Sequence, residues 1–197
     1  VTFLSTGMSN LNEISNAINI LIKNGLKKQN LILLQCTTDY PLNEKFVNLN
    51  VLETFKRKYK VKVGLSDHTL GSEAPVAATA LGISAIEKHF TLSRKLKGPD
   101  HRSSLEPKEL YEMVKAIKKT KLILGTNKKK LLPVEKPNIK EARKSIVAKK
   151  IIKKGEIFTE NNITTKRPYY GICSSKWFKI LGKKSKRNFK KNDFIKI

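Results

Sequence analysis

Short apolar runs alternate with longer segments of helical periodicity in residues 1–125. This alternation restricts the possible folds of the region more than any other feature of the sequence. Each run precedes a segment whose apolar residues recur at the spacing of one helix face. The runs begin at Phe3, Leu31, Val61 and Ile83, and the helical segments cover about residues 11–22, 48–59, 73–81 and 107–123. The order predicts an α/β fold with a parallel sheet and right-handed crossovers. Four such units make half of a TIM (β/α)8 barrel, which typically needs about 250 residues.

Helix boundaries in this region carry the expected glycine and proline signals. Gly25 follows the first helical segment and Gly82 follows the Ala-rich third segment, both where a helix end favours glycine. Pro107 stands at the start of the last segment, and proline suits the first position of a helix.

The chain changes character after residue 125. Residues 126–140 are rich in Lys and Pro, which is typical of a linker. Residues 141–197 contain short β-prone runs separated by turns, and they predict a small, mostly-β module.

Charge and composition exclude several classes of protein. A 39% hydrophobic content is enough for a packed core, so wholesale disorder is excluded. No apolar run approaches the roughly 20 residues of a membrane span, so we expect no membrane protein. The two cysteines, Cys36 and Cys173, indicate no disulfide framework, and a reducing cytoplasm is the default location.

The formal net charge of +25 raises the question of an anionic partner. The basic residues are mostly lysines scattered along the chain, without interleaved aromatics or arginine forks, so we do not expect nucleic acid as a partner. Residues 130–197 hold 20 of the Lys and Arg residues and only 5 Asp and Glu.

Two histidines occupy equivalent positions in successive βα units. His68 and His89 each follow the carboxyl end of a predicted strand, which in an α/β barrel is the catalytic mouth. Neighbouring strand ends lie close enough for two imidazoles to share one metal ion. The alternative is that each histidine only caps or packs. Asp67 and Glu87 beside them are either partners of these imidazoles or members of structural ion pairs with lysines.

A loop at residues 98–104 follows the second histidine. Its Gly98-Pro99 pair sets a rigid turn that holds Asp100 near the mouth, together with an arginine and two serines. Loops at this face of a barrel also bind sugars and anions; the alternative is a turn that leads into the helix at Pro107.

Taken together, these segments resemble the N-acetylneuraminate (sialic acid) synthase family, and six strings carry the resemblance in the family's order. They are Ser5-Thr6-Gly7-Met8, Cys36-Thr37-Thr38-Asp39-Tyr40-Pro41, Gly64-Leu65-Ser66-Asp67-His68-Thr69-Leu70-Gly71, Glu87-Lys88-His89-Phe90-Thr91, Gly98-Pro99-Asp100-His101 and Thr165-Lys166-Arg167-Pro168. The resemblance implies the C-terminal half of the TIM barrel over residues 1–125, a linker over 126–140 and an antifreeze-like (SAF) domain over 141–197.

The resemblance also implies an activity. Members of the family condense phosphoenolpyruvate with N-acetylmannosamine and use a divalent metal, most often Mn²⁺, with Mg²⁺ or Co²⁺ as alternatives. Legionaminate and pseudaminate synthases share most of these strings, so their modified amino sugars stay open. A catalytically dead basic binding module is the alternative from another class.

Residue roles follow from the same resemblance. The two histidines match the family's metal ligands, and three further residues match phosphoenolpyruvate contacts and two match contacts to the amino sugar. The metal ligands are His68 and His89, the phosphoenolpyruvate contacts are Ser5, Thr38 and Ser66, and the sugar contacts are Tyr40 and Asp100. Arg167 matches an arginine that one subunit inserts into its partner's active site, which implies a domain-swapped homodimer.

Three departures from the family pattern stand out. Thr38 occupies a position where other members have Asn, and Tyr169-Tyr170 replace the Gly-Asn that usually follows the Lys-Arg-Pro string. The resemblance begins at the family's fifth strand, so its phosphate-binding lysine and catalytic glutamate have no counterpart here. We therefore expect a fragment of a longer protein, with residues 1–197 catalytically silent by themselves.

Overall fold

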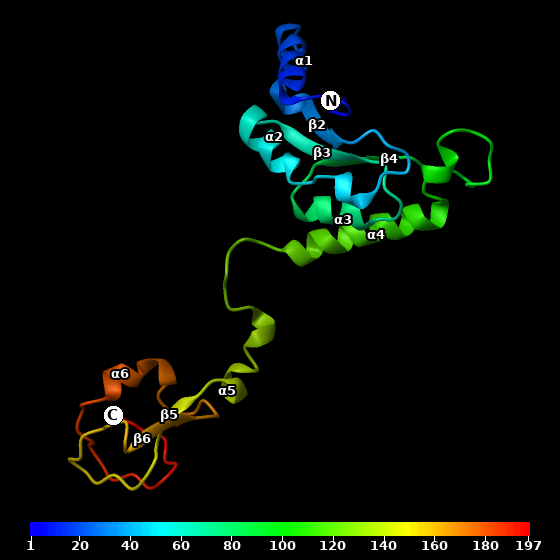
Figure 1. The fold of residues 1–197 in the computed structure, drawn as a ribbon. Coiled ribbons are helices and arrows are strands. Elements are labelled where there is room, and N and C mark those ends of the chain that lie inside the picture. The colour runs from blue at the N-terminus through cyan, green and yellow to red at the C-terminus, as the bar shows by residue number, and fades with distance from the viewer. The chain divides into compact units, whose positions relative to one another are not determined.

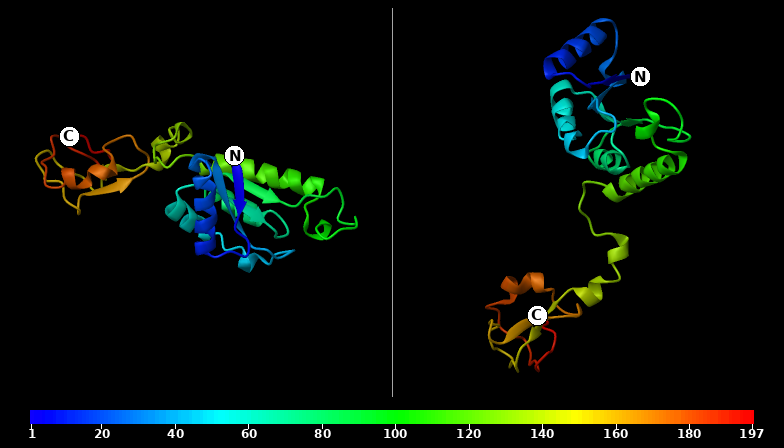
Figure 2. Two further views of the ribbon diagram at one scale, coloured as in Figure 1. Left: turned by 90° about the horizontal axis from the view of Figure 1, so that it is seen from above. Right: turned by 45° about the vertical axis from the view of Figure 1, so that its right-hand side comes forward.

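Four parallel strands form the sheet of the first unit in the computed structural model, which describes residues 1–197 (Figure 1). The strands pair in chain order and are β1 (Thr2–Ser5), β2 (Leu31–Cys36), β3 (Lys62–Asp67) and β4 (Ala85–Lys88). The helices between and after them are α1 (Leu11–Lys23), α2 (Val51–Tyr59), α3 (Glu73–Ala80) and α4 (Pro107–Leu124). This is the expected half of an α/β barrel, and Figure 2 gives two further views of the sheet and its helices.

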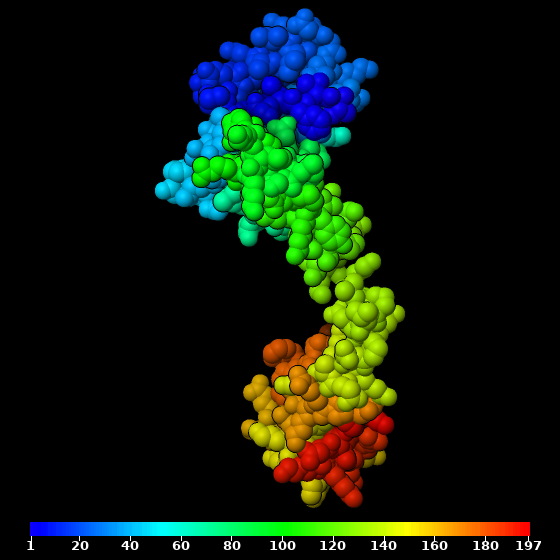
Figure 3. Space-filling model, turned by 90° about the vertical axis from the view of Figure 1, so that its right-hand side faces the viewer, coloured from blue at the N-terminus to red at the C-terminus, as the bar shows by residue number.

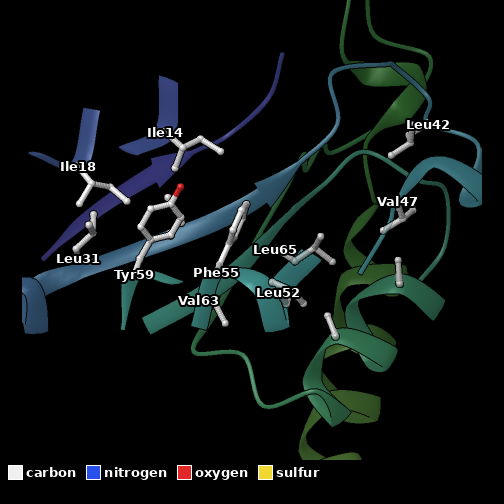
Figure 4. Packing of buried hydrophobic residues seen from close by; sticks show 13 residues of the cluster. Ile14, Ile18, Leu31, Leu42, Val47, Leu52, Phe55, Tyr59, Val63 and Leu65 are labelled. Carbon is white, nitrogen blue, oxygen red and sulfur yellow. The ribbon is translucent and has the colours of Figure 1, made fainter. Parts of the chain in front are cut away.

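The core of this unit lies between the sheet and its helices. Alternate strand residues face the helices, as the two-residue period of a strand requires. Figure 4 shows Phe55 and Tyr59 of α2 beside Ile14 and Ile18 of α1 and Leu31 of β2. The cluster also contains Leu33, Leu42, Val47, Leu52, Val63, Leu65, Ala74 and Ala78. The helical periodicity of the sequence therefore marks the buried faces of α1 and α2.

The helix ends in the first unit follow the sequence signals. The Asn10 side chain caps α1 by accepting from the backbone amides of Asn12 and Glu13, and the Glu13 carboxylate accepts from the Asn10 amide. Gly25 follows α1 with a φ of +95°, in the left-handed region that glycine enters without strain. Pro107 occupies the first turn of α4, as predicted.

The second unit is small and has one regular two-stranded sheet. The chain divides into units Val1–Thr126 and Asn127–Ile197. Strands β5 (Ser145–Ala148) and β6 (Ile163–Lys166) pair antiparallel, and short helices α5 (Ile139–Ala142) and α6 (Trp177–Ile180) accompany them. The core residues of this unit are Ile146, Ala148, Ile152, Phe158, Ile163, Ile180, Phe189 and Ile195. Figure 3 shows the surface of the chain in space-filling form.

The segment predicted as a linker contains local structure. Pro133–Glu135 forms a 3₁₀ turn, in which the Glu135 carboxylate accepts from the Leu132 amide, and α5 begins within the segment at Ile139. Proline favours the first turn of a helix, which explains why the 3₁₀ turn begins at Pro133. No helix anywhere in residues 1–197 combines the length and the apolar character needed to cross a bilayer.

Candidate active site

The two candidate metal ligands lie side by side at the carboxyl ends of adjacent strands. Asp67 of β3 pairs in register with Lys88 of β4, so the next residues, His68 and His89, leave the sheet at the same level. Their ring centroids are 5.3 Å apart with an interplanar angle of 62°. The sheet register therefore brings together two imidazoles that are 21 positions apart in the sequence.

His68 has a defined orientation. Its residue is 6% exposed, and its Nδ1 lies 2.8 Å from the Thr37 carbonyl oxygen. Because a carbonyl oxygen only accepts, Nδ1 carries the proton of the neutral ring and donates it. The Nε2 lone pair is then left for a metal ion, and a backbone carbonyl on the other ring nitrogen is a common arrangement at such ligands.

Tyr40 packs against both imidazoles. Its ring centroid lies 4.2 Å from that of His68 and 5.5 Å from that of His89. The loop that carries it is anchored because the Leu42 amide donates to the His68 carbonyl oxygen at 2.8 Å. Burial raises the pKa of the Tyr40 phenol, and the negative potential of Cys36, Asp100 and Glu87 raises it further. Tyr40 therefore keeps its proton at neutral pH and can donate a hydrogen bond at the mouth.

Asp100 approaches the site from the loop after β4. Its Oδ2 lies 3.8 Å from the Nδ1 of His89, which is too far for a hydrogen bond. The loop is held in place at its far end, where the Leu105 amide donates to the His89 carbonyl oxygen at 2.9 Å. His101 in the same loop pairs instead with Thr91, Nδ1 to Oγ1 at 2.7 Å. Of His89 and His101, only His89 therefore lies against His68.

The polar side chains that precede the two histidines along β3 and β4 form hydrogen bonds or ion pairs with one another. Ser66 donates from Oγ to Glu87 Oε1 at 2.7 Å across β3 and β4. Lys88 Nζ lies 2.5 Å from Asp67 Oδ2, and the side chains of this ion pair are 3% and 0% exposed. Lys88 also donates to the Thr69 carbonyl oxygen at 2.6 Å. The ion-pair alternative therefore holds for Asp67, whereas Glu87 contacts a serine.

The remaining predicted residues lie farther from the histidines or in the second unit. Ser5 is exposed at the carboxyl end of β1, and Thr38 is exposed in the loop after β2. Thr38 borders a hollow of about 1030 Å³ in the first unit, which residues of the β1–α1 and β2–α2 segments line and which does not include the histidines. Arg167 follows β6, where its Nε donates to the Ala142 carbonyl oxygen at 2.8 Å.

The donor set fits a divalent cation. Two imidazoles lie in T-shaped contact with ring centroids 5.3 Å apart, and in His68 the backbone contact engages Nδ1 and leaves Nε2 for another partner. No group of three or more His, Cys, Asp or Glu side chains could hold a metal in residues 1–197. Two imidazoles by themselves would leave several coordination positions open to oxygen donors.

The sequence predicted no role for one contributor to this geometry, and for a second it left the lysine unnamed. The Thr37 carbonyl orients His68, and no side-chain pattern reveals a role that any residue's backbone performs. Lys88 joins the two strand ends through Asp67. The sequence signal was a charged residue directly before each candidate ligand, since a buried charge needs a partner, but only the register places Lys88 level with Asp67.

Comparisons with known proteins agree with this architecture. The NeuB family matches residues 2–129 and the SAF domain matches residues 143–197. The chain is 49% identical to an N,N'-diacetyllegionaminic acid synthase of Campylobacter jejuni subsp. jejuni, over 98% of this chain and 58% of that protein. It is 37% identical to a pseudaminic acid synthase of the same organism, over 99% of this chain and 56% of that protein.

A solved structure completes the comparison. The N-acetylneuraminic acid (sialic acid) synthetase of Leptospira borgpetersenii, crystallised with citrate, is 40% identical with a TM-score of 0.63, covering 71% of this chain and 48% of that one. The chain thus spans little more than half the length of the curated relatives it matches. On the match over residues 2–129 and the half-barrel observed there, the chain belongs to the NeuB family.

Proposed function

We propose that the protein containing this chain is a metal-dependent synthase that condenses phosphoenolpyruvate with an N-acetylated amino sugar to give a nonulosonic acid and phosphate. The observation that carries the proposal is the pair of imidazoles, His68 and His89, facing each other at 5.3 Å between ring centroids at the carboxyl ends of β3 and β4. Carboxyl ends of strands are where α/β barrels carry their chemistry.

The two histidines would hold the cation, for which we propose Mn²⁺, with Mg²⁺ or Co²⁺ as alternatives. Two nitrogen donors completed by oxygen donors from substrate and water form a mixed set that such ions accept. When bound, the ion supplies a Lewis acid for the carbonyl oxygen of the open-chain sugar.

The substrate contacts are proposed as the family resemblance implies them. Ser5, Thr38 and Ser66 would bind phosphoenolpyruvate, and hydroxyl donors there would stabilise charge that develops on the phosphate. Tyr40 and Asp100 would bind the sugar, because both lie beside His89. In the reaction, carbon 3 of phosphoenolpyruvate bonds to the aldehyde carbon, water adds at carbon 2, and the carbon–oxygen bond to phosphate breaks.

We propose that Arg167 completes the site of a second subunit in a domain-swapped homodimer. It is exposed, and beyond the Nε contact to Ala142 the structure gives its terminal nitrogens no protein partner. A planar guanidinium with free donors fits the hydroxyl and carbonyl groups of a sugar. Next to it, the Tyr169 amide donates to the Lys140 carbonyl oxygen at 2.7 Å, and the Tyr170 ring lies 5.9 Å from that of Phe194.

N-acetylmannosamine is the proposed sugar. A second candidate is the diacetamido sugar that leads to N,N'-diacetyllegionaminic acid, because a relative with that printed activity is 49% identical to this chain. The full-length protein with Mn²⁺ should release phosphate from phosphoenolpyruvate only when one of these sugars is present, and the preferred sugar identifies the product. Phosphate release that does not depend on any amino sugar would contradict the proposal.

A further inference from the structure

The second unit carries a dense basic surface that the proposed reaction does not use. Segments 149–156 and 183–191 together contain ten Lys and Arg residues and a single acidic residue, Glu156. All ten cationic residues are exposed, and they are Lys149, Lys150, Lys153, Lys154, Lys183, Lys184, Lys186, Arg187, Lys190 and Lys191. We refer to these two segments as the basic surface.

Backbone hydrogen bonds hold the two segments together. Ile152 and Phe189 exchange amide-to-carbonyl bonds of 2.9 and 2.8 Å, and the Gly155 amide donates to the Ser185 carbonyl oxygen at 2.8 Å. The buried side chains of Ile152 and Phe189 face the core of the unit. In extended chain the neighbouring side chains point to the opposite face, so Lys153 after Ile152 and Lys190 after Phe189 share the solvent side.

The cations have no acidic partners. The ion pairs that Lys and Arg make with carboxylates all lie in the first unit, from Arg57–Glu53 to Lys115–Glu112. Two carboxylates accept from backbone amides of these segments rather than pairing with a lysine side chain: Glu156 accepts from the Lys153 amide and Asp193 accepts from the Lys190 amide. Ten cationic side chains against the single carboxylate of Glu156 leave the basic surface with a large net positive charge.

Exposed aliphatic side chains lie among these charges. Ile151 stands between Lys150 and the buried Ile152 and is 69% exposed, and Ile157, which bridges to Lys184, is 48% exposed. The one aromatic residue in the two segments, Phe189, is 1% exposed, so the surface offers no platform on which nucleic-acid bases could stack. Lysines around an exposed isoleucine match a lipid interface instead, where ammonium groups meet headgroup phosphates and an aliphatic group enters the acyl boundary.

We propose that the basic surface binds the anionic headgroups of a lipid bilayer and attaches the protein reversibly to a membrane. Each lysine near an anionic lipid surface adds to the attraction, so several lysines acting together give measurable binding. The proposal is independent of the synthase reaction, since none of these residues belongs to the candidate active site.

Sedimentation with lipid vesicles tests the proposal on the full chain. We expect binding to vesicles of phosphatidylcholine with about one third phosphatidylglycerol, little binding to phosphatidylcholine alone, and loss of binding as salt rises. A quadruple variant with glutamine at four positions should weaken vesicle binding at least about tenfold. The positions are Lys149, Lys150, Lys153 and Lys154.

A matched variant removes four positive charges from exposed lysines of α4. It should bind vesicles nearly as tightly as the wild type does. Its glutamines replace Lys108, Lys118, Lys119 and Lys121. Ile151→Ser should weaken binding without any change of charge, whereas Ile20→Ser, at a position 61% exposed in the first unit, should not. Unchanged thermal unfolding of the four variants shows that each remains folded.

Three results would overturn the proposal. Equal losses in the two quadruple variants would show an effect of net charge alone. An Ile151→Ser variant with wild-type vesicle binding would contradict the lipid interface, which is argued from an aliphatic group among the lysines that enters the acyl boundary. Tight, salt-sensitive binding of RNA that the first quadruple variant abolishes, without vesicle binding, would assign the surface to nucleic acid.

Discussion

At the scale of single residues, the candidate site depends on how His68 is held. Its Nδ1 donates to the Thr37 carbonyl oxygen, so its Nε2 is free to bind metal. Replacement of His68 or His89 by alanine should weaken Mn²⁺ binding at least about tenfold, measured by calorimetric titration of the full-length protein. His101→Ala is the control, because that ring pairs with Thr91 outside the histidine pair. Equal Mn²⁺ occupancy in the wild type and the double variant would remove the claim.

The buried ion pair beneath the histidines makes a second residue-scale prediction. Lys88 and Asp67 are 3% and 0% exposed, so Lys88→Met leaves a carboxylate buried without its cation. We expect the first unit to lose about 3–5 kcal/mol of unfolding free energy in urea. Arg57→Met breaks a pair whose side chains are 80% and 56% exposed, and it should cost less than about 1 kcal/mol. Similar costs for the two variants would show that the buried pair does not stabilise the strand ends.

At the scale of elements, the centre of the sheet allows no side chain at Gly64 in β3. A Cβ there would lie 2.6 Å from the Ala85 carbonyl oxygen of β4 and 2.5 Å from the Leu34 side chain of β2. Gly64→Ala should therefore destabilise the first unit by about 1–3 kcal/mol and disturb the alignment of β3 with β4. Lys62→Ala, at an exposed position of the same strand, is the control and should stay within about 0.5 kcal/mol of the wild type.

Because β3 and β4 carry the two histidines, the same substitution should also weaken Mn²⁺ binding. The measurements are urea unfolding and calorimetric titration. A Gly64→Ala variant with wild-type stability would show that the neighbouring strand moves aside without cost.

At the scale of the whole molecule, the prediction concerns how two subunits cooperate. If Arg167 acts in the partner's site, full-length subunits carrying Arg167→Ala mixed with subunits carrying His68→Ala form heterodimers with one doubly defective site and one intact site. We expect the mixture to recover activity that neither variant has alone. Confirmed heterodimers without any activity would contradict action across the dimer. A parallel mixture with Arg143→Ala in place of Arg167→Ala is the control for the loss of a nearby cation.

The sequence by itself determined the order of elements, since apolar periodicity and the signals at Gly25 and Pro107 reflect local burial and helix-end chemistry. It also placed His68 and His89 at strand ends, because the carboxyl ends of parallel strands meet at one edge. Only the tertiary structure decided that the two rings face each other at 5.3 Å, because that distance depends on strand register. The Lys88–Asp67 pair, the Thr37 carbonyl contact and the pairing of the two basic segments also join residues that are distant in the sequence. No local sequence pattern specifies which groups meet across strands, so only the tertiary structure decides these contacts.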